Sequence, residues 1–242
     1  GEVPDAKAVR PPEHRAPVGM ARGASDDCIW QEADNIAAHT YMMGERSMLE
    51  ITVVEESTAS PRAATTLATI NKQGFMFPSP IQSQAWPYLL AGKDVIGIAQ
   101  TGTGKTLAFL LPAMIHIDNQ KLPRGKRGGP NVLVMAPTRE LAQQISMEVA
   151  KYEYKGIKSV CVYGGGSVKE QIKVITQGVE ISIATPGRFN DLVSREIICL
   201  DSITYVVLDE ADRMLDMGFE PQLRKTLLDI RPDRQTVMTS AT

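Results

Sequence analysis

The stretch Ala99-Gln100-Thr101-Gly102-Thr103-Gly104-Lys105-Thr106 stands between two apolar runs, 95–98 and 107–111. The first run is typical of a buried strand and the second of the start of a helix. A Gly-rich turn between a strand and a helix that opens with Lys-Thr is typical of a phosphate-binding loop, although Ala99 stands where the usual pattern has Gly. Glycine lets the backbone fold closely around an anion, and the N–H groups of the helix's first turn point toward it. The stretch therefore predicts a phosphate site.

Each residue type in this loop has an expected role. Lys105 is expected to reach the β- and γ-phosphates, and the Thr106 hydroxyl is expected to bind Mg²⁺. The alternative is an ordinary Gly-rich turn, which the Gly-Lys-Thr ending in this context disfavours. Backbone N–H groups that surround the phosphates are expected from Thr101, Gly102, Thr103 and Gly104.

Strand-like and helix-like segments alternate along the rest of the chain. This alternation predicts an α/β fold with three layers, a mostly parallel central sheet and helices on both faces. We expect this domain to span 65–242, with helices at 67–74 and 81–90. The predicted strands are 95–99, 132–136, 159–163, 180–184, 203–208 and 236–239.

Composition excludes several classes of protein. The chain is 43% hydrophobic and 22% charged with a net charge of −2, so it has no global basic field and any nucleic-acid site must be local. Its three cysteines, Cys28, Cys161 and Cys199, are far apart, which argues against a disulfide scaffold or a zinc site. We expect an intracellular protein of the nucleus or the cytoplasm. The apolar runs are too short to span a membrane, so no membrane partner is expected.

Residues 1–64 differ from the rest of the chain. They hold six Lys or Arg residues against eleven Asp or Glu residues, and four prolines fall within the first twenty positions. This composition predicts a partly disordered extension, with a short amphipathic helix over 26–41. The helix could dock a partner, pack on its own domain or be a frayed tail.

A second acidic motif follows the predicted strand 203–208. Asp209-Glu210-Ala211-Asp212 begins where that strand ends, and ligands of open α/β sheets bind beyond the carboxyl ends of strands. Asp209 is expected to complete the Mg²⁺ site through water, and Glu210 to orient or deprotonate the attacking water. The alternative is that these carboxylates cap the following helix.

Asp209-Glu210-Ala211-Asp212 resembles the box that names the DEAD-box RNA helicases, and the resemblance extends over 74–242. It implies the first RecA-like domain of an enzyme that uses ATP, with ADP as product and Mg²⁺ as cofactor. It also implies a second RecA-like domain in the intact protein. The resemblance is to the p68/Vasa-like branch of the family, and within that branch the stretches 81–87 and 231–238 resemble the helicases that carry an upstream KH domain.

The stretch 74–82 resembles the adenine-binding Q motif of this family. A Gln side chain can donate to a ring nitrogen of adenine and accept from its amino group, whereas guanine presents the reverse polarity. The resemblance therefore implies that Gln82 selects ATP over GTP and that Phe75 packs near the base. The family has an aromatic residue about seventeen positions before this Gln, where the chain has Thr65.

Three further stretches, 137–141, 164–165 and 185–188, resemble the family's RNA-binding motifs. They imply contacts to backbone phosphates and 2′-hydroxyls that do not depend on RNA sequence. Each motif alone is also explained by plain helix capping, and Arg188 could instead bond to the 209–212 loop. A flexible basic loop at 121–130 either contacts nucleic acid or is merely solvated. The implied RNA-binding residues are Pro137, Thr138, Arg139, Gly164, Gly165, Thr185, Pro186, Gly187 and Arg188.

The resemblance also implies that Asp212, Ser240 and Thr242 couple the ATP site to the RNA site and to the second domain. The family's arginine finger lies in that second domain, so we expect this domain alone to be a nearly inactive monomer. Two other readings are a P-loop kinase for a small metabolite and a docking platform that acts through 1–64.

Overall fold

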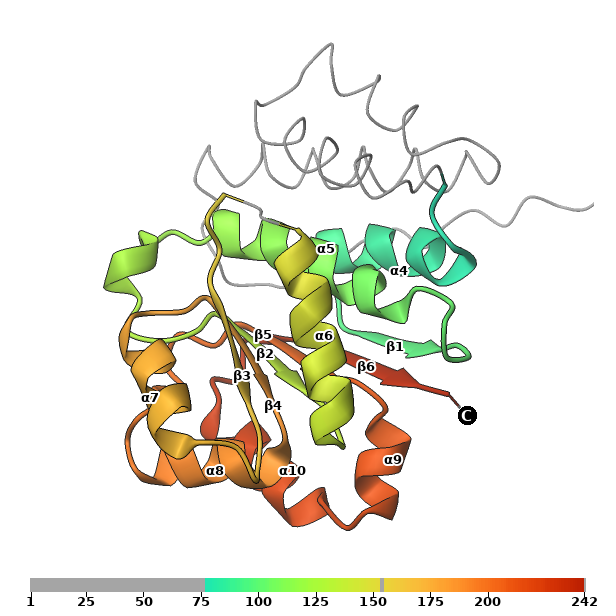
Figure 1. Cartoon of the computed structure of the whole chain (residues 1–242). Helices are drawn as coiled ribbons and strands as arrows, with labels where there is room; N and C mark the ends of the chain where they lie inside the picture. Colours follow the sequence, from blue (N-terminus) through green and yellow to red (C-terminus); the bar gives the residue numbers. More distant parts are fainter. Residues whose placement is uncertain (1–76, 153–154, 242) are drawn as a thin grey trace, which may run out of the picture.

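The computed structural model describes residues 77–152 and 155–241, which form one six-stranded sheet with helices on both faces (Figure 1). Every pairing between the strands is parallel, and the strand order is β1-β6-β5-β2-β4-β3. The predicted three-layer α/β fold is confirmed. The strands are β1 (Val95–Ile98), β2 (Val132–Met135), β3 (Ser159–Val162), β4 (Ile181–Ala184), β5 (Tyr205–Leu208) and β6 (Gln235–Ser240).

Each predicted strand is found within two residues of its predicted bounds, and the helix predicted at 81–90 is α4. The extension predicted at 1–64 and the helix predicted at 67–74 lie outside the described residues. Within 77–152 and 155–241, no helix combines the length and apolarity that a membrane crossing requires. The helices are α4 (Pro80–Leu90), α5 (Lys105–Asp118), α6 (Arg139–Lys151), α7 (Val168–Thr176), α8 (Pro186–Ser194), α9 (Ala211–Asp216) and α10 (Glu220–Asp229), with a 3₁₀ turn, η1 (Arg124–Lys126).

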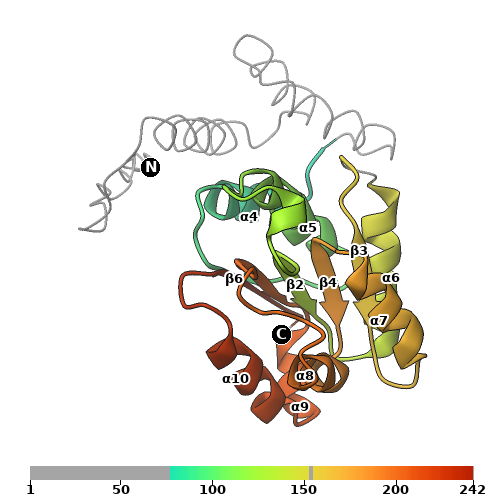
Figure 2. The ribbon, with the colours of Figure 1, turned by 90° about the vertical axis from the view of Figure 1, so that its left-hand side faces the viewer.

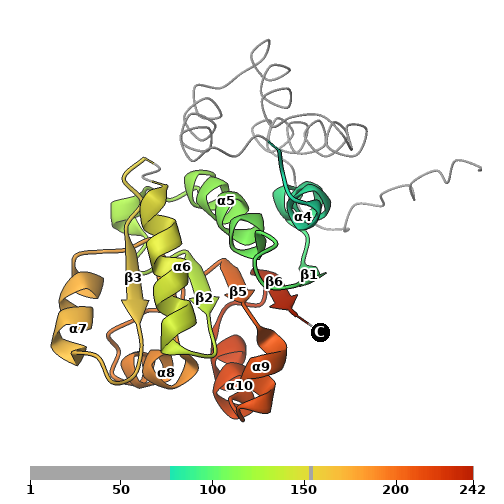
Figure 3. The same cartoon turned by 45° about the vertical axis from the view of Figure 1, so that its right-hand side comes forward.

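The sheet separates two hydrophobic clusters. Helices α4, α5 and α6 cover one face, and α8, α9 and α10 cover the other (Figure 3). Val206 and Val207 of β5 belong to opposite clusters because successive side chains of a strand point to opposite faces. Phe109 of α5 and Phe189 of α8 are completely buried, one in each cluster. Burial of each such ring contributes about 1.5–3 kcal/mol.

The central strands β2, β4 and β5 are buried along their whole length, as their continuous apolar runs predict. Strand β1 is different, because it is an edge strand that pairs only with β6 among the described strands. Its Ile96 and Ile98 are 72% and 66% exposed. The strand that leads into the phosphate-binding loop therefore lies at the margin of the sheet.

The basic loop at 121–130 is anchored, whereas the sequence predicted a flexible loop. Arg124 donates to Asp118 at 2.7 Å and to the carbonyl of Lys155 at 2.6 Å. Arg127 donates to the side-chain oxygen of Asn131 at 2.6 Å. These acceptors lie at the end of α5 and at the amino ends of the strands. The basic residues are therefore used to fix the loop, at the edge of the sheet opposite the phosphate-binding loop.

Candidate functional site

The predicted motifs begin where the hydrogen-bonded ladder of the sheet ends, at its carboxyl edge (Figure 2). The N–H of Ala99 donates to the carbonyl of Ser240 at 3.0 Å, and the N–H of Asp209 donates to β2 at 2.9 Å. The N–H of Thr185 donates to β3 at 2.9 Å in the same way. Because all the strands are parallel, these ends share one edge, and this edge is where such sheets bind ligands.

Two glycines give the phosphate-binding loop its shape. Gly102 and Gly104 have φ angles of +82° and +88°, which residues with a Cβ rarely adopt. A Cβ on Gly104 would also lie 2.6 Å from Nε2 of Gln82. Thr101 is exposed and Thr103 is half-buried, so the outer part of the loop borders solvent. The backbone conformation therefore favours glycine at position 104, and a Cβ there would displace the carboxamide of Gln82.

Lys105 lies under this loop and is 8% exposed. Its Nζ donates to the carbonyl of Ala99 at 2.5 Å and lies 3.5 Å from the carbonyl of Ser240. An ammonium group has three donors, so one remains for a phosphate oxygen. The next residue, Thr106, places a half-buried hydroxyl in the first turn of α5. The lysine thus connects the loop to the end of β6, a link that the sequence did not predict.

Gln82 stabilises the loop from the side. Its Oε1 accepts from the N–H of Ser79 at 2.9 Å, and its Nε2 donates to the carbonyl of Gly104 at 3.1 Å. The carboxamide retains one more N–H and one more lone pair, which is what the predicted contact with adenine needs. Gln82 can therefore contact the base and the phosphate loop together. Phe75, the predicted packing partner of the base, lies outside the described residues.

The carboxylate of Asp209 is buried, with only 3% of the residue exposed. Its Oδ1 accepts a hydrogen bond from the hydroxyl of Thr239 in β6. Burial is the main cause that raises the pKa of Asp209, while the bond from Thr239 and the charge of Lys105 oppose this rise. A cation bound at this carboxylate would favour its ionised form further.

Glu210 has a left-handed backbone, with φ +54° and ψ +52°, immediately before α9. Its N–H donates to Oγ1 of Thr239 at 3.3 Å. Its carboxylate accepts from Nη1 of Arg213 at 3.1 Å. Glu210 is predicted to act on the attacking water. Its carboxylate must therefore release Arg213 before it can bind that water.

The oxygen donors at this edge fit a hydrated magnesium ion. Among the described residues, no three His, Cys, Asp or Glu side chains are grouped so that they could hold a metal together. Mg²⁺ usually keeps several waters and takes one or two protein oxygens plus substrate phosphates. The carboxylate of Asp209 and the hydroxyl of Thr106 supply such oxygens. The residues present thus suit a metal that arrives with a nucleotide.

The motif that follows β2 contacts the turn that follows β3. The hydroxyl of Thr138 caps α6 by accepting a backbone N–H at 3.3 Å. The exposed guanidinium of Arg139 lies over the ring of Tyr163, 5.0 Å from its centre, and close to Gly165. This cation–π contact presents the arginine beside exposed backbone. The flanking predicted residues are Pro137, which is buried, and Gly164, which is exposed.

Arg188 connects α8 to the same turn. Its Nη1 donates to Oε1 of Gln171 at 3.0 Å and lies 3.4 Å from the carbonyl of Gly166. Its hydrogen-bond partners among the described residues lie in 166–171, and its Nε lies 4.0 Å from Oδ2 of Asp191, whereas the predicted alternative was a bond to the 209–212 loop. The guanidinium reaches α7 and its preceding turn because α8 packs beside them.

The start of α8 keeps polar groups available. Thr185 occupies the N-cap position and Pro186 the first turn, as predicted, but the Thr185 hydroxyl accepts no capping bond. Gly187 is exposed next to them. Unlike Thr138, the Thr185 hydroxyl is not engaged in capping its helix. Free donors and hydroxyls at a helix N-terminus are suited to phosphate.

Sequence reasoning missed three residues of this surface. The ring of Tyr163 lies under Arg139, and the side chain of Gln171 accepts a hydrogen bond from Arg188. Gly166 has no side chain, so Tyr163 and Gln171 can both lie close to its backbone. A Cβ on Gly166 would lie 2.8 Å from the ring of Tyr163 and 2.9 Å from Nε2 of Gln171. A usable signal is the aromatic residue that ends the predicted strand 159–163, directly before three consecutive glycines.

The predicted coupling residues are described only in part. Asp212 is half-buried in the first turn of α9, and Ser240 ends β6 with its carbonyl beside Ala99 and Lys105. Thr242 lies outside the described residues. Ser240 thus contacts the phosphate loop through its backbone carbonyl.

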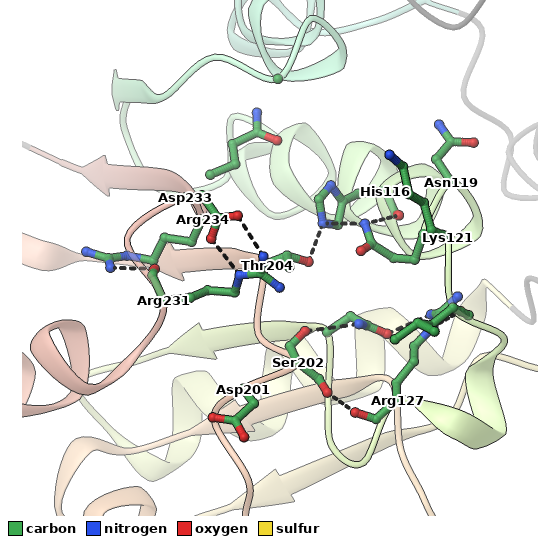
Figure 4. A pocket seen from close by; sticks show the side chains of 15 residues that line it. His116, Asn119, Lys121, Arg127, Asp201, Ser202, Thr204, Arg231, Asp233 and Arg234 are labelled. Atoms are coloured by element: carbon green, nitrogen blue, oxygen red, sulfur yellow. Dashed lines mark hydrogen bonds and ion pairs between the residues drawn. The ribbon is translucent and has the colours of Figure 1, made fainter. Parts of the chain in front are cut away.

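A polar cavity of about 570 Å³ lies at the opposite, amino edge of the sheet (Figure 4). Two of its arginines have partners in the lining: Arg231 pairs with Asp233 at 2.5 Å, and Arg127 donates to the side-chain oxygen of Asn131. His116 shares a hydrogen bond of 2.7 Å with Thr204. Lys121, Leu122 and Arg127 of the basic loop line this cavity, but no residue of the phosphate-binding loop, the 209–212 motif or the three RNA-binding motifs does, so the cavity is separate from the candidate site.

Comparison with known proteins agrees with this arrangement. Residues 79–242 match the model of the DEAD/DEAH box helicase family. The chain is 61% identical over 176 residues to the probable ATP-dependent RNA helicase DDX43 of Homo sapiens, covering 73% of this chain and 27% of that protein. It is 56% identical over 178 residues to DEAD-box ATP-dependent RNA helicase 30 of Arabidopsis thaliana, covering 73% and 30%. It is 48% identical over 227 residues to the ATP-dependent RNA helicase dbp2 of Sclerotinia sclerotiorum, covering 93% and 38%. The chain thus spans well under half the length of these relatives.

Proposed function

The chain belongs to the DEAD/DEAH box helicase family, and on this basis we propose that it is the ATP-binding RecA-like domain of an ATP-dependent RNA helicase. One observation carries the proposal: the phosphate loop, the Asp-Glu-Ala-Asp motif and the end of β6 meet at one edge of the sheet. Lys105 contacts Ser240, and Asp209 and Glu210 both contact Thr239. The domain would extend over 65–242, after an extension at 1–64.

ATP would bind with its base against Gln82 and its phosphates in the 99–106 loop. Gln82 holds the carbonyl of Gly104, so recognition of the base would also order the loop that receives the phosphates. Lys105 would give its remaining donor to the β- and γ-phosphates. Thr106 and Asp209 would hold Mg²⁺, which neutralises charge that develops on the phosphates.

Glu210 would orient the water that attacks the γ-phosphate. Its backbone is fixed at Thr239, but its carboxylate is bound to Arg213 in this structure. Release of that ion pair would let the carboxylate accept a proton or a hydrogen bond from water. The Glu210–Arg213 pair therefore corresponds to a resting arrangement of the site.

RNA would bind across the turns that follow β2, β3 and β4. Arg139 and the N-termini of α6 and α8 offer cationic and N–H donors to phosphates. Such contacts recognise the RNA backbone and not its bases, which suits a protein that acts on many short duplexes. With a second RecA-like domain, closure over ATP and RNA would separate strands locally, and hydrolysis would release the product.

The test compares ATP hydrolysis by this 242-residue chain with hydrolysis by a form that also carries a second RecA-like domain. We expect slow hydrolysis by the chain alone and RNA-stimulated hydrolysis by the longer form, because an arginine finger contributes about 10³–10⁵ in rate. Glu210→Gln in the longer form should retain ATP binding and lose turnover. Full RNA-stimulated turnover by the chain alone, or normal turnover by Glu210→Gln, would contradict the proposal.

A further inference from the structure

Thr239 brings a buried hydroxyl to the centre of the candidate site. It is 4% exposed, and its side chain shares a face of β6 with Val237, which belongs to the hydrophobic cluster under α5. Its register partner in β1 is Gly97, just before the phosphate loop. A buried hydroxyl costs free energy unless it is hydrogen-bonded, so its partners identify what it does.

The chemistry of the partners fixes the direction of both hydrogen bonds. A carboxylate only accepts, so the Thr239 O–H donates to Oδ1 of Asp209. A backbone N–H only donates, so Glu210 donates to Oγ1 of Thr239 at 3.3 Å. The only hydrogen of the hydroxyl is thereby used for Asp209. One side chain holds two consecutive residues of the acidic motif, from a strand about thirty residues away.

Each of these bonds constrains a feature that the proposed chemistry needs. The bond to Oδ1 limits rotation of the Asp209 carboxylate, which is the group proposed to hold the hydrated metal. The bond from the Glu210 N–H fixes a residue in the left-handed region, where a side chain costs about 1–2 kcal/mol. That conformation sets the direction in which the Glu210 side chain leaves the backbone.

We propose that Thr239 is a positioning residue that holds the metal-binding carboxylate of Asp209 and the backbone of Glu210 as one unit. The inference rests on the proposed function, since it assigns Asp209 to Mg²⁺. Thr239 also connects this unit to the phosphate loop, because the carbonyl of the next residue, Ser240, lies 3.5 Å from Nζ of Lys105. A shift of the end of β6 would move the carboxylate, the glutamate and the lysine together.

The test uses the 242-residue chain and a fluorescent adenine diphosphate, titrated with and without Mg²⁺. Thr239→Val keeps the shape of the side chain and removes the hydroxyl. We expect it to raise the Mg²⁺ concentration that half-saturates the tight nucleotide complex by about 10- to 100-fold, the usual effect of losing a partner of a metal ligand. Affinity measured in a chelator should be unchanged, and Thr239→Ser, which keeps the hydroxyl, should restore most of the Mg²⁺ dependence.

Thr226 offers a matched control. It is 2% exposed, and its hydroxyl bonds to Asn190 at 2.7 Å and to the carbonyl of Gln222 at 3.0 Å, away from the site. Thr226→Val should lower the melting temperature without changing the Mg²⁺ dependence. If Thr239→Val behaves like Thr226→Val, or if Ser fails to restore binding, Thr239 is merely structural and the inference is wrong.

Two further measurements distinguish a folding defect, a failure of this inference and a failure of the proposed function. If Thr239→Val does not fold, Thr239→Cys replaces it, since a thiol in the place of the Ser hydroxyl is only a weak donor. The Ser and Cys variants should then differ about tenfold or more in Mg²⁺ dependence, and equal values would overturn the inference. If the unmodified chain itself shows no Mg²⁺-dependent binding of adenine nucleotide, the proposed function fails instead.

Discussion

Nη1 of Arg213 lies 3.1 Å from Oε2 of Glu210, so the glutamate expected to act on water is held by the next turn of its own helix. The arginine side chain is 56% exposed, whereas that of the glutamate is only 15% exposed. The bond is therefore accessible to competition from a ligand or a second domain. Its strength is that of a partly screened surface pair, about 0.2–1 kcal/mol.

Removal of this pair should speed hydrolysis. We expect Arg213→Ala to raise the basal ATP turnover of a two-domain form by at most about fivefold, the factor that corresponds to 1 kcal/mol. Steady-state phosphate release measures the change. Arg224→Ala is the control, because it breaks an exposed pair with Glu220 outside the site. A turnover that falls, or that rises equally in both variants, would show that Arg213 does not restrain Glu210.

Gly104→Ala should damage nucleotide binding more than it damages the fold. Its Cβ would meet Gln82, whereas a Cβ on Gly178, which also has positive φ, would meet nothing within 4 Å. Both substitutions should cost about 1–2 kcal/mol of stability from the left-handed backbone. Only Gly104→Ala should also weaken adenine nucleotide binding, by tenfold or more, and reduce the preference for ATP over GTP. Thermal unfolding and nucleotide titration of the two variants separate these effects, and equal nucleotide affinities would count against the Gln82 contact.

The Arg139–Tyr163 contact predicts two different losses of RNA affinity. Arg139→Ala should weaken binding to single-stranded RNA of any sequence and lower the slope of log affinity against log salt by about one. Tyr163→Leu should weaken binding while the slope stays unchanged, because the charge remains but loses its support. Fluorescence anisotropy at several salt concentrations measures both. An unchanged slope for Arg139→Ala would remove that residue from the RNA interface.

His116 should make stability depend on pH. Burial first, and then the charge of Arg127, lower its pKa to about 4, against 6.5 for an ordinary histidine. The unfolded chain therefore binds the proton more readily, and stability is lost as pH falls from about 6.5 to 4, by up to about 3 kcal/mol. Urea unfolding at several pH values should show this decline in the unmodified chain. His116→Gln cannot titrate, so an equally steep decline in that variant would assign the effect to other groups.

The sequence predicts those structural features that are determined by residues adjacent in the chain. The phosphate loop, the 209–212 motif and the strand cores were recognised because Gly, Lys and apolar runs have strong local preferences. The other strand ends differ from prediction by at most one residue, and the largest difference falls at a turn: strand β5 begins at Tyr205, not at 203, because the N–H of Ile203 donates to Leu200 within the preceding turn.

What the sequence could not predict are the bonds between distant segments. Gln82 and Gly104 are 22 positions apart, and Lys105 and Ser240 are 135 apart, so no local pattern links them. The basic loop at 121–130 shows the same limit. Its charges suggested a solvated or nucleic-acid-binding segment, because the acceptors that fix it, such as Asp118, become adjacent only in the folded chain.

The marginal position of β1 has a consequence for local stability. Amide hydrogens are protected from exchange according to the free energy of opening, which is lowest where backbone bonds are solvent-exposed and apolar contacts are few. With Ile96 and Ile98 exposed, β1 should exchange sooner than β2, β4 or β5. The phosphate loop thus follows a strand that is less protected than these three central strands. Binding of the nucleotide should order β1, and this ordering makes the net free energy of binding less favourable. Amide hydrogens along β1 should therefore exchange more slowly when the nucleotide is bound.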